Sequence, residues 1–285
     1  MQSMNAMQRK LAGVIAFAFA IALLVWRLHP VPEPVYNSKP LSAWVQQYST
    51  NNWRPEGRPA AQEAEVAIRQ IGTNAIPLLL DRIRVRESPL KKKVRTFVPQ
   101  SWQDRLYLRD RTEETRSTGA YGLAALGTNA PSAVPALIEI GTHHPDEDGR
   151  SIAVYAVGTL GSAAEPAIPF LIQCLTNKVF MIRSYAASGL GNVQRQPEIV
   201  VPALTQYLDF TKASPHMVEP TAAIASLARF GIYAKPAVPF ISSFLTNPVP
   251  IFRKIATNAL SQIGAEPTVS NRFDSSVALK PSSVR

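Results

Sequence analysis

One short stretch of the sequence, GTHHPDEDGR, places residue types that bind metal ions side by side. His143 and His144 are followed by Asp146, Glu147 and Asp148. Imidazole nitrogens and carboxylate oxygens are ordinary ligands of divalent metals. The same spacing is typical of a loop between two helices, and an acidic residue just before GRSIAVYA suits a helix N-cap. We favour the loop, and we expect neither a metal nor a cofactor.

No other group of residues has the types and spacing of a catalytic site. The remaining histidines, His29 and His216, are isolated in the sequence, and no glycine-rich phosphate loop is present. The single cysteine, Cys174, excludes an internal disulfide bond and a cysteine-rich zinc site. It lies in the apolar run FLIQCL, which favours a buried, unreactive thiol. We therefore expect a protein that is not an enzyme.

Positive charge is concentrated in one segment, residues 82–111. The chain has a formal net charge of +10, and this segment holds ten Lys or Arg residues against three acidic ones, a net +7. Three hypotheses stay open: a solvated basic loop, a contact with anionic lipid or an acidic partner, and a contact with nucleic acid, which is the least favoured. The candidate residues for contact with an anionic surface are Lys91, Lys92, Lys93 and Arg95.

The aromatic residues of this segment have two possible roles. Trp102 and Tyr107 could stack on nucleic-acid bases. We instead expect them to pack the segment against the rest of the fold.

The N-terminus contains an uncharged, apolar run from Leu11 to Trp26. Arg9 and Lys10 precede the run, and Arg27 follows it. This pattern predicts a signal-anchor over residues 1–28 with a cytoplasmic N-terminus, and hence a single-pass membrane protein whose other residues are periplasmic. A cleaved signal peptide, which would give a secreted protein, and a buried soluble helix are the alternatives. The proline-rich residues 29–40 are expected to form a stiff spacer.

A recurring glycine divides the rest of the chain. The intervals after Gly127 are 34, 30, 40 and 33 residues, in the range of helical-hairpin repeats. Apolar residues precede each glycine by one and four positions, and small residues precede it by five and eight, with Arg183 as the exception. These positions share one face of a helix that ends at the glycine. The glycines are Gly72, Gly127, Gly161, Gly191, Gly231 and Gly264.

A proline then begins the second helix of each hairpin. Its missing N–H is tolerated at the first helical position, and an apolar run follows it in each case. The prolines are Pro77, Pro135, Pro169, Pro202 and Pro239.

The chain resembles the HEAT repeat family over roughly Pro59–Pro267. The resemblance rests on three first-helix sequences and on the proline-led apolar runs of the second helices, and the first-helix sequences are RSTGAYGLAALG, RSIAVYAVGTLG and RKIATNALSQIG. The order of anchor, KPLSAWVQQY-like segment and repeats is similar to membrane-anchored bacterial HEAT-repeat proteins. The resemblance implies an all-α, right-handed α-α superhelix (a HEAT-type solenoid) of about six helical hairpins. It also implies a binding scaffold and no particular reaction.

The solenoid is expected over residues 41–267, with the basic insertion at 82–111 and a disordered tail at 268–285. Leu41, Trp44, Val45 and Tyr48 have the spacing of an amphipathic helix that covers the first repeat.

Two polar rows follow the prolines by four and by seven residues, and they are expected to line the concave face of the solenoid. We therefore predict a membrane-tethered, non-enzymatic scaffold that binds a protein or peptide there. The alternative is a basic HEAT-like protein that binds nucleic acid or anionic lipid. The candidate partner-binding residues are Asp81, Arg84, Glu139, Gln173, Gln206, Asp209 and Ser243.

Overall fold

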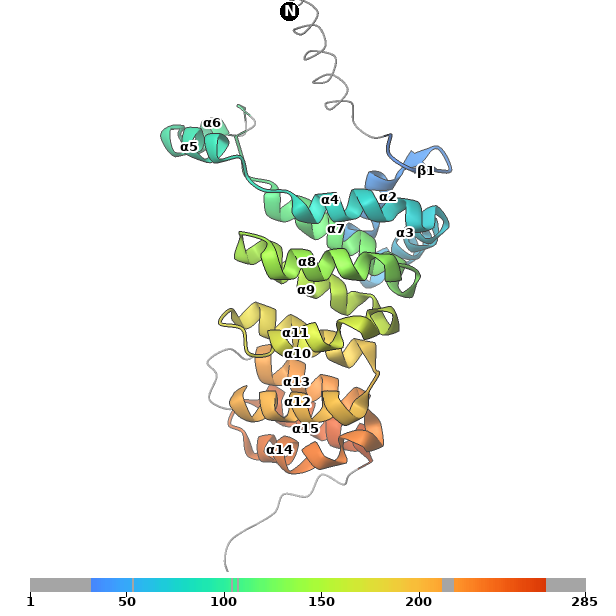
Figure 1. The fold of residues 1–285 in the computed structure, drawn as a ribbon, viewed down its shortest axis with the longest axis vertical. Coiled ribbons are helices and arrows are strands. Elements are labelled where there is room, and N and C mark those ends of the chain that lie inside the picture. The colour runs from blue at the N-terminus through green and yellow to red at the C-terminus, as the bar shows by residue number, and fades with distance from the viewer. Residues whose placement is uncertain (1–31, 53, 104, 107, 212–217, 265–285) are drawn as a thin grey trace, which may run out of the picture.

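The computed structural model of the chain describes residues 32–264 except 53, 104, 107 and 212–217 (Figure 1). The predicted anchor at residues 1–28 and the predicted tail at 268–285 lie outside the described residues.

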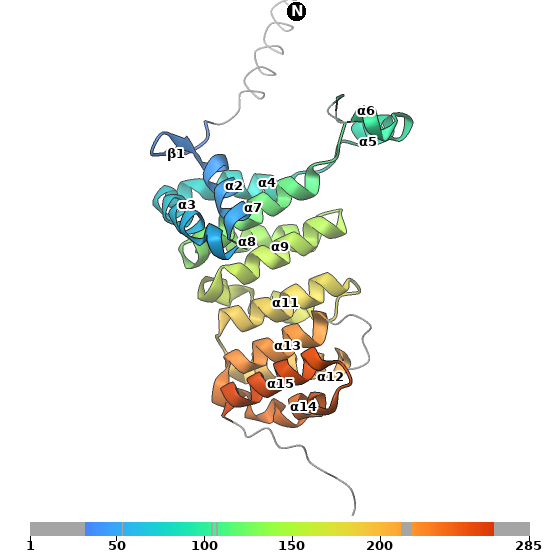
Figure 2. The ribbon, with the colours of Figure 1, turned by 180° about the vertical axis from the view of Figure 1, so that it is seen from behind.

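The described chain is an all-α, right-handed superhelix of stacked helical hairpins, a HEAT-like solenoid (Figure 1). Neighbouring first helices lie side by side, as Figure 2 shows from behind. The first helices are α3 (Arg58–Ile71), α7 (Thr112–Leu126), α9 (Glu147–Thr159), α11 (Phe180–Val193), α13 (Val218–Arg229) and α15 (Pro250–Ile263). The second helices are α4 (Ile76–Arg84), α8 (Val134–His143), α10 (Ile168–Cys174), α12 (Pro197–Thr211) and α14 (Val238–Ser242).

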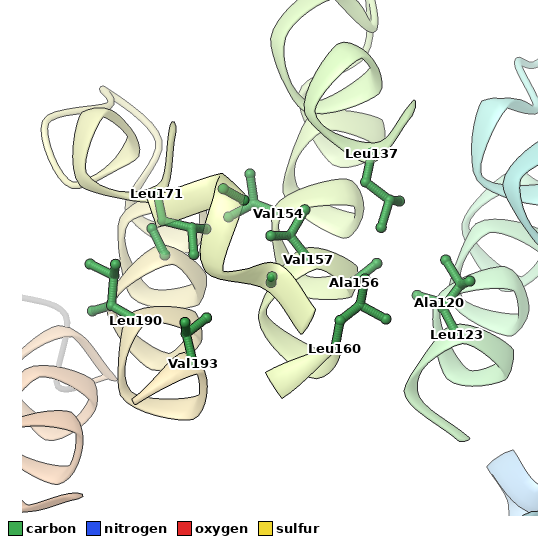
Figure 3. Close-up of a cluster of buried hydrophobic side chains, with 14 of the residues drawn as sticks. Ala120, Leu123, Leu137, Val154, Ala156, Val157, Leu160, Leu171, Leu190 and Val193 are labelled. Atoms are coloured by element: carbon green, nitrogen blue, oxygen red, sulfur yellow. The ribbon is translucent and has the colours of Figure 1, made fainter. Parts of the chain in front are cut away.

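The core is a continuous stripe of aliphatic side chains between the two layers of helices (Figure 3). Leu123, Leu137, Leu160 and Leu171 are fully buried in it. The first helices approach one another closely because small residues face the neighbouring helix. A Cβ atom added to Gly158 on α9 would lie 2.7 Å from the Cα atom of Gly189 on α11. The backbones of these helices are therefore in direct contact.

Five of the six predicted helix-ending glycines have a positive φ, and Gly191 does not. Helix α11 continues past Gly191 to Val193, and Gln194 takes the left-handed conformation, with φ of 49°. Gly191 instead allows close packing, because a Cβ atom there would lie 2.4 Å from Ser226 Oγ. The prediction that Gly191 ends a helix is wrong. Counted from helix end to helix end, the intervals after Gly127 are 34, 33, 37 and 33 residues.

The corrected register explains the exception at Arg183. Eleven residues before Gly161, Gln194 and Gly264 stand Arg150, Arg183 and Arg253. The Nη1 atom of each donates a hydrogen bond to the carbonyl oxygen six residues earlier, at 2.6–2.7 Å. Each of these arginines thus holds the loop that precedes its own first helix.

The chain before the first repeat is folded against the solenoid. In α2 (Leu41–Asn51) the predicted apolar residues Leu41, Trp44, Val45 and Tyr48 are all buried, as expected for a capping helix. Strands β1 (Val35–Tyr36) and β2 (Lys39–Pro40) form an antiparallel hairpin in place of the expected stiff spacer. The carboxylate of Glu33 fixes it by accepting hydrogen bonds from the backbone N and the Oγ of Ser42.

The basic segment stands away from the solenoid (Figures 1 and 2). Helix α4 extends to Arg84, so the projecting part is residues 85–111, which we call the basic arm. It contains α5 (Pro89–Phe97) and the short α6 (Gln100–Gln103). The expectation that Trp102 packs the segment onto the fold is wrong, because 56% of this side chain is exposed. Tyr107 lies outside the described residues.

Within the part of the chain that the structure describes, no helix has the length and apolar character needed to cross a membrane. The predicted single-pass localisation with a periplasmic repeat domain is contradicted by this finding, and it is not carried further. The alternative, a secreted protein, rests on residues 1–28, which lie outside the described residues.

Candidate functional site

The two predicted polar rows lie on the second helices and their C-terminal ends, and all ten residues are exposed. We call this surface the second-helix face. The first row is Asp81, Glu139, Gln173, Gln206 and Ser243, and the second is Arg84, Thr142, Thr176, Asp209 and Thr246.

At the N-terminal end of this face three predicted residues meet. Arg84 lies 3.4 Å from the carboxylate of Asp81 on its own helix and 4.0 Å from that of Glu139 on the next second helix. These pairs are exposed, so they contribute little to stability. They leave the local charge of the face nearly balanced.

Two hollows lie on either side of α12, and Gln206 lines both of them. The first has a volume of about 290 Å³ and lies between α10 and α12, with Leu175, Tyr207 and Phe210 in its wall. The second has a volume of about 650 Å³ and lies between α12 and α14. Its wall includes Val201, Asp209, Tyr233 and Phe240. Gln206, Asp209 and Thr176 are thus the predicted face residues that line hollows around α12.

A buried ion pair supports the first hollow. The Nε atom of Arg183 lies 2.7 Å from Oε1 of Glu219, a residue with no exposed surface. The hydroxyl of Tyr207 donates a hydrogen bond to the same oxygen at 3.1 Å. The Arg183 guanidinium also lies 5.7 Å from the centre of the Phe210 ring, within the range of a cation–π contact. Phe210 therefore lines the first hollow beside a charge-paired wall.

The protonation states in this wall follow from its burial. Burial raises the pKa of the Tyr207 hydroxyl, and the neighbouring Glu219 raises it further, so Tyr207 remains protonated at neutral pH. The hydrogen bond to Glu219 raises the pKa of Arg183. Both shifts keep Tyr207 and Arg183 in their protonated forms at neutral pH.

Sequence reasoning missed the aromatic residues around α12. Phe210 and Tyr233 are 64% and 63% exposed, an unusual position for large aromatic side chains. Nothing in the repeat pattern marks them. Arg183 did stand out in the sequence as the charged residue among small ones, and it is the residue that supports the first hollow.

The stretch GTHHPDEDGR, whose residue types could bind a metal ion, spans the connection between α8 and α9. His144 is buried, and its Nδ1 accepts a hydrogen bond from the backbone N of Asp146 at 3.2 Å. Asp146 precedes α9, but its side chain makes no cap hydrogen bond. Its carboxylate binds the buried guanidinium of Arg116 instead. Among the described residues no three His, Cys, Asp or Glu side chains are placed to hold a metal ion.

Cys174 is buried, as predicted, and burial raises the pKa of its thiol to about 12. The thiolate that would react as a nucleophile is therefore scarce at neutral pH.

The predicted anionic-surface residues differ in how they are engaged within the basic arm. Arg95 is paired with Glu87 at 2.7 Å and with Asp110 at 3.5 Å. The Nζ atom of Lys91 donates a hydrogen bond to the carbonyl oxygen of Arg109 at 3.2 Å. The side chains of Lys92 and Lys93 are exposed.

No protein-family model matches the chain, and no curated protein matches it. Several solved structures are similar to the chain, among them the following two. The complex of CpcE and CpcF of phycocyanin lyase from Nostoc sp. PCC7120 has a TM-score of 0.46 and 29% identity, and the match covers 64% of this chain and 71% of that chain. An engineered protein has a TM-score of 0.42 and 19% identity, with coverage of 79% and 98%.

The first of these neighbours is described as a lyase, which is an enzyme. This finding contradicts the prediction that the chain is not an enzyme, and we withdraw that prediction. Because both TM-scores are below 0.5, neither neighbour assigns a reaction or a partner to this chain.

Proposed function

We propose that the chain binds an extended segment of a protein partner on its second-helix face, with α12 as the anchor. The observation that carries this proposal is the position of Gln206 between two hollows. A glutamine amide both donates and accepts hydrogen bonds, so it can pair with the backbone of an extended peptide. The hollows on either side then receive two of the peptide's side chains.

The walls of the hollows define the chemistry of the bound segment. Leu175, Phe210, Tyr233 and Phe240 provide apolar and aromatic surface. Such surfaces provide most of the affinity at the centre of an interface. The charges nearby are Asp209 and Glu198 in the second hollow and the paired Arg183 in the first. A segment with two apolar or aromatic side chains and mixed polar residues between them fits this face.

A selection of displayed random peptides on the full chain tests the proposal. We expect enriched peptides to contain two large apolar residues. Their affinity should fall by about tenfold or more in Gln206→Ala and in Phe210→Ala, since central interface residues cost more than about 1.4 kcal/mol when truncated.

Matched changes on α3 provide the controls. Gln70→Ala removes an exposed glutamine, and Val66→Ala removes an exposed apolar side chain, from a first helix. They should leave peptide affinity unchanged. Peptides that bind all four variants equally well would exclude α12 as the anchor.

A further inference from the structure

The basic arm exposes large apolar side chains as well as charge. Five of the thirteen large hydrophobic residues that are exposed in the described part of the chain lie between residues 90 and 106. Phe97 is 80% exposed and Leu90 is 73% exposed. Large apolar side chains that are exposed together in one segment indicate an interaction surface. The five residues are Leu90, Val94, Phe97, Trp102 and Leu106.

Helix α5 has an apolar side and a basic side, and Lys93 lies near the border between them. Leu90, Val94 and Phe97 are spaced at i, i+4 and i+7, so they share one side of the helix, and Lys92 falls on the opposite side. The whole arm contains eight Lys or Arg residues against three acidic ones. Glu87 and Asp110, two of these three acids, are paired with Arg95. The exposed charge of the arm is therefore mainly positive.

Ion pairs and a hydrogen bond hold the two ends of the basic arm in place. Arg95 connects α5 to both ends of the arm through Glu87 and Asp110. The buried Arg116 donates a hydrogen bond to the carbonyl oxygen of Val85, where the arm begins. The apolar and basic side chains are thus presented on a structured projection and not on a loose loop (Figure 1).

We propose that the basic arm binds the surface of an anionic lipid layer. Short helices with Lys on one side and Phe, Leu or Trp on the other insert their apolar side chains at the boundary between headgroups and acyl chains. Trp102 and Phe97 are residue types that stabilise such insertion. Lys92, Lys93 and Arg105 would meet the anionic headgroups. This contact is peripheral and requires no membrane span.

The apolar residues distinguish lipid from the other anionic ligands. Nucleic acid would use the lysines and Trp102, but Leu90, Val94 and Leu106 have no aromatic ring to stack on bases. A protein groove needs a fixed spacing of apolar residues along one helix. The three from α5 have such a spacing, but Trp102 and Leu106 come from the segment after the helix and would lie outside a groove that holds α5 alone. A fluid lipid interface accepts apolar side chains in either arrangement.

Sedimentation of the full chain with vesicles tests the charge requirement. We expect the chain to bind vesicles of phosphatidylcholine mixed with phosphatidylserine. Removing three lysine charges from the arm should weaken this binding roughly a hundredfold, from the contribution of each basic residue near an anionic surface. The arm variant combines Lys91→Gln, Lys92→Gln and Lys93→Gln, and the control combines Lys178→Gln, Lys235→Gln and Lys254→Gln.

Fluorescence of Trp102 tests insertion by the arm itself, because it does not respond to binding by another part of the chain. The Trp102 signal is obtained by subtracting the emission of Trp102→Phe from that of the unmodified chain. We expect its emission to shift to shorter wavelength with anionic vesicles and not with pure phosphatidylcholine. Leu90→Ser combined with Phe97→Ser should abolish the shift.

Three results would overturn the proposal. The first is an unchanged Trp102 emission with anionic vesicles. The second is an equal loss of binding in the arm variant and the control variant. The third is a Trp102 change with DNA or with an acidic protein at a salt concentration where vesicles give none. Loss of the Trp102 shift in the arm variant alone, together with its decline at high salt, would support the proposal.

Discussion

The Nε atom of Arg116 donates a hydrogen bond to the carbonyl oxygen of Val85 at 2.9 Å, although the basic arm separates the two residues in the sequence. In the hairpins without an insertion, the equivalent Arg150 and Arg183 bind a carbonyl oxygen only six residues earlier. Val85 therefore occupies the place of His144, and both have the extended backbone that ends a second helix. The arm enters the loop between α4 and α7 without disturbing the stacking of the hairpins.

Deleting residues 86–110 should leave the solenoid folded. The deletion joins Val85 to Arg111 and places Arg116 six residues after Val85, which is the spacing of Arg150 after His144. Loops of similar length differ little in closure entropy, so we expect a change in unfolding free energy below about 1 kcal/mol. Urea unfolding followed by circular dichroism measures it. A broad or multistep transition in the deletion variant would show that the arm is part of the stack.

Gly158→Ala should destabilise the protein although it lies within a helix. Helix propensity alone would make alanine about 1 kcal/mol more stable than glycine. Here the added Cβ atom would lie 2.7 Å from Gly189 Cα, so the backbones of α9 and α11 must separate. We expect a net loss of about 1–3 kcal/mol, as for an overpacked core.

Thermal unfolding measures the effect of Gly158→Ala, and Ser188→Ala, at an exposed position on α11, serves as the control. A higher midpoint for Gly158→Ala than for the unmodified chain would mean that the two helices are not in backbone contact.

The ion pair between Asp146 and Arg116 should make stability depend on acid pH. The hydrogen bond from Arg116 lowers the pKa of Asp146 below its usual value. In the interval between the folded and unfolded pKa values the unfolded chain binds more protons, so stability rises with pH there. The contribution is complete above about pH 4, the unfolded value, and it is lost as the pH falls through the folded pKa.

Asp146→Asn should flatten this acid dependence of the unfolding free energy, as measured by urea titrations at a series of pH values. Asp148→Asn removes one nearby exposed carboxylate and leaves the partner of Arg116 in place. An acid dependence that is identical in the unmodified chain and in Asp146→Asn would assign the effect to other carboxylates.

The helical hairpins were predictable because their signals are local. A proline within the first turn and a glycine after the last turn act through the backbone of their own helix, and five of the six glycines and four of the five prolines do so. Pro202 lies inside α12, which already begins at Pro197, so the prediction that Pro202 begins the helix is wrong. Gly191 led to a wrong prediction of where α11 ends. A glycine can end a helix or can allow two helices to pack closely, and the sequence alone does not distinguish these two roles.

The hollows around α12 were not predictable from the same pattern. Gln206 and Asp209 were found because each stands at a fixed distance from Pro202. The wall of the first hollow depends on Arg183 meeting Glu219, which is 36 residues further along the chain. Phe210 and Tyr233 belong to different elements, and no spacing rule relates them. Likewise, the β1–β2 hairpin depends on Glu33 reaching Ser42 across the turn.

The buried pair of Arg183 and Glu219 also gives the first hollow a mechanical role. Arg183 belongs to α11 and Glu219 to α13, so the residue that walls the hollow also fastens one hairpin to the next. In a solenoid each repeat contacts only its neighbours, so the stability is approximately a sum over the repeats and the interfaces between them. The hollow itself lies between α10 and α12, so a ligand in it would bridge the α9–α10 and α11–α12 hairpins. The force needed to pull those two hairpins apart would then report whether the hollow is occupied.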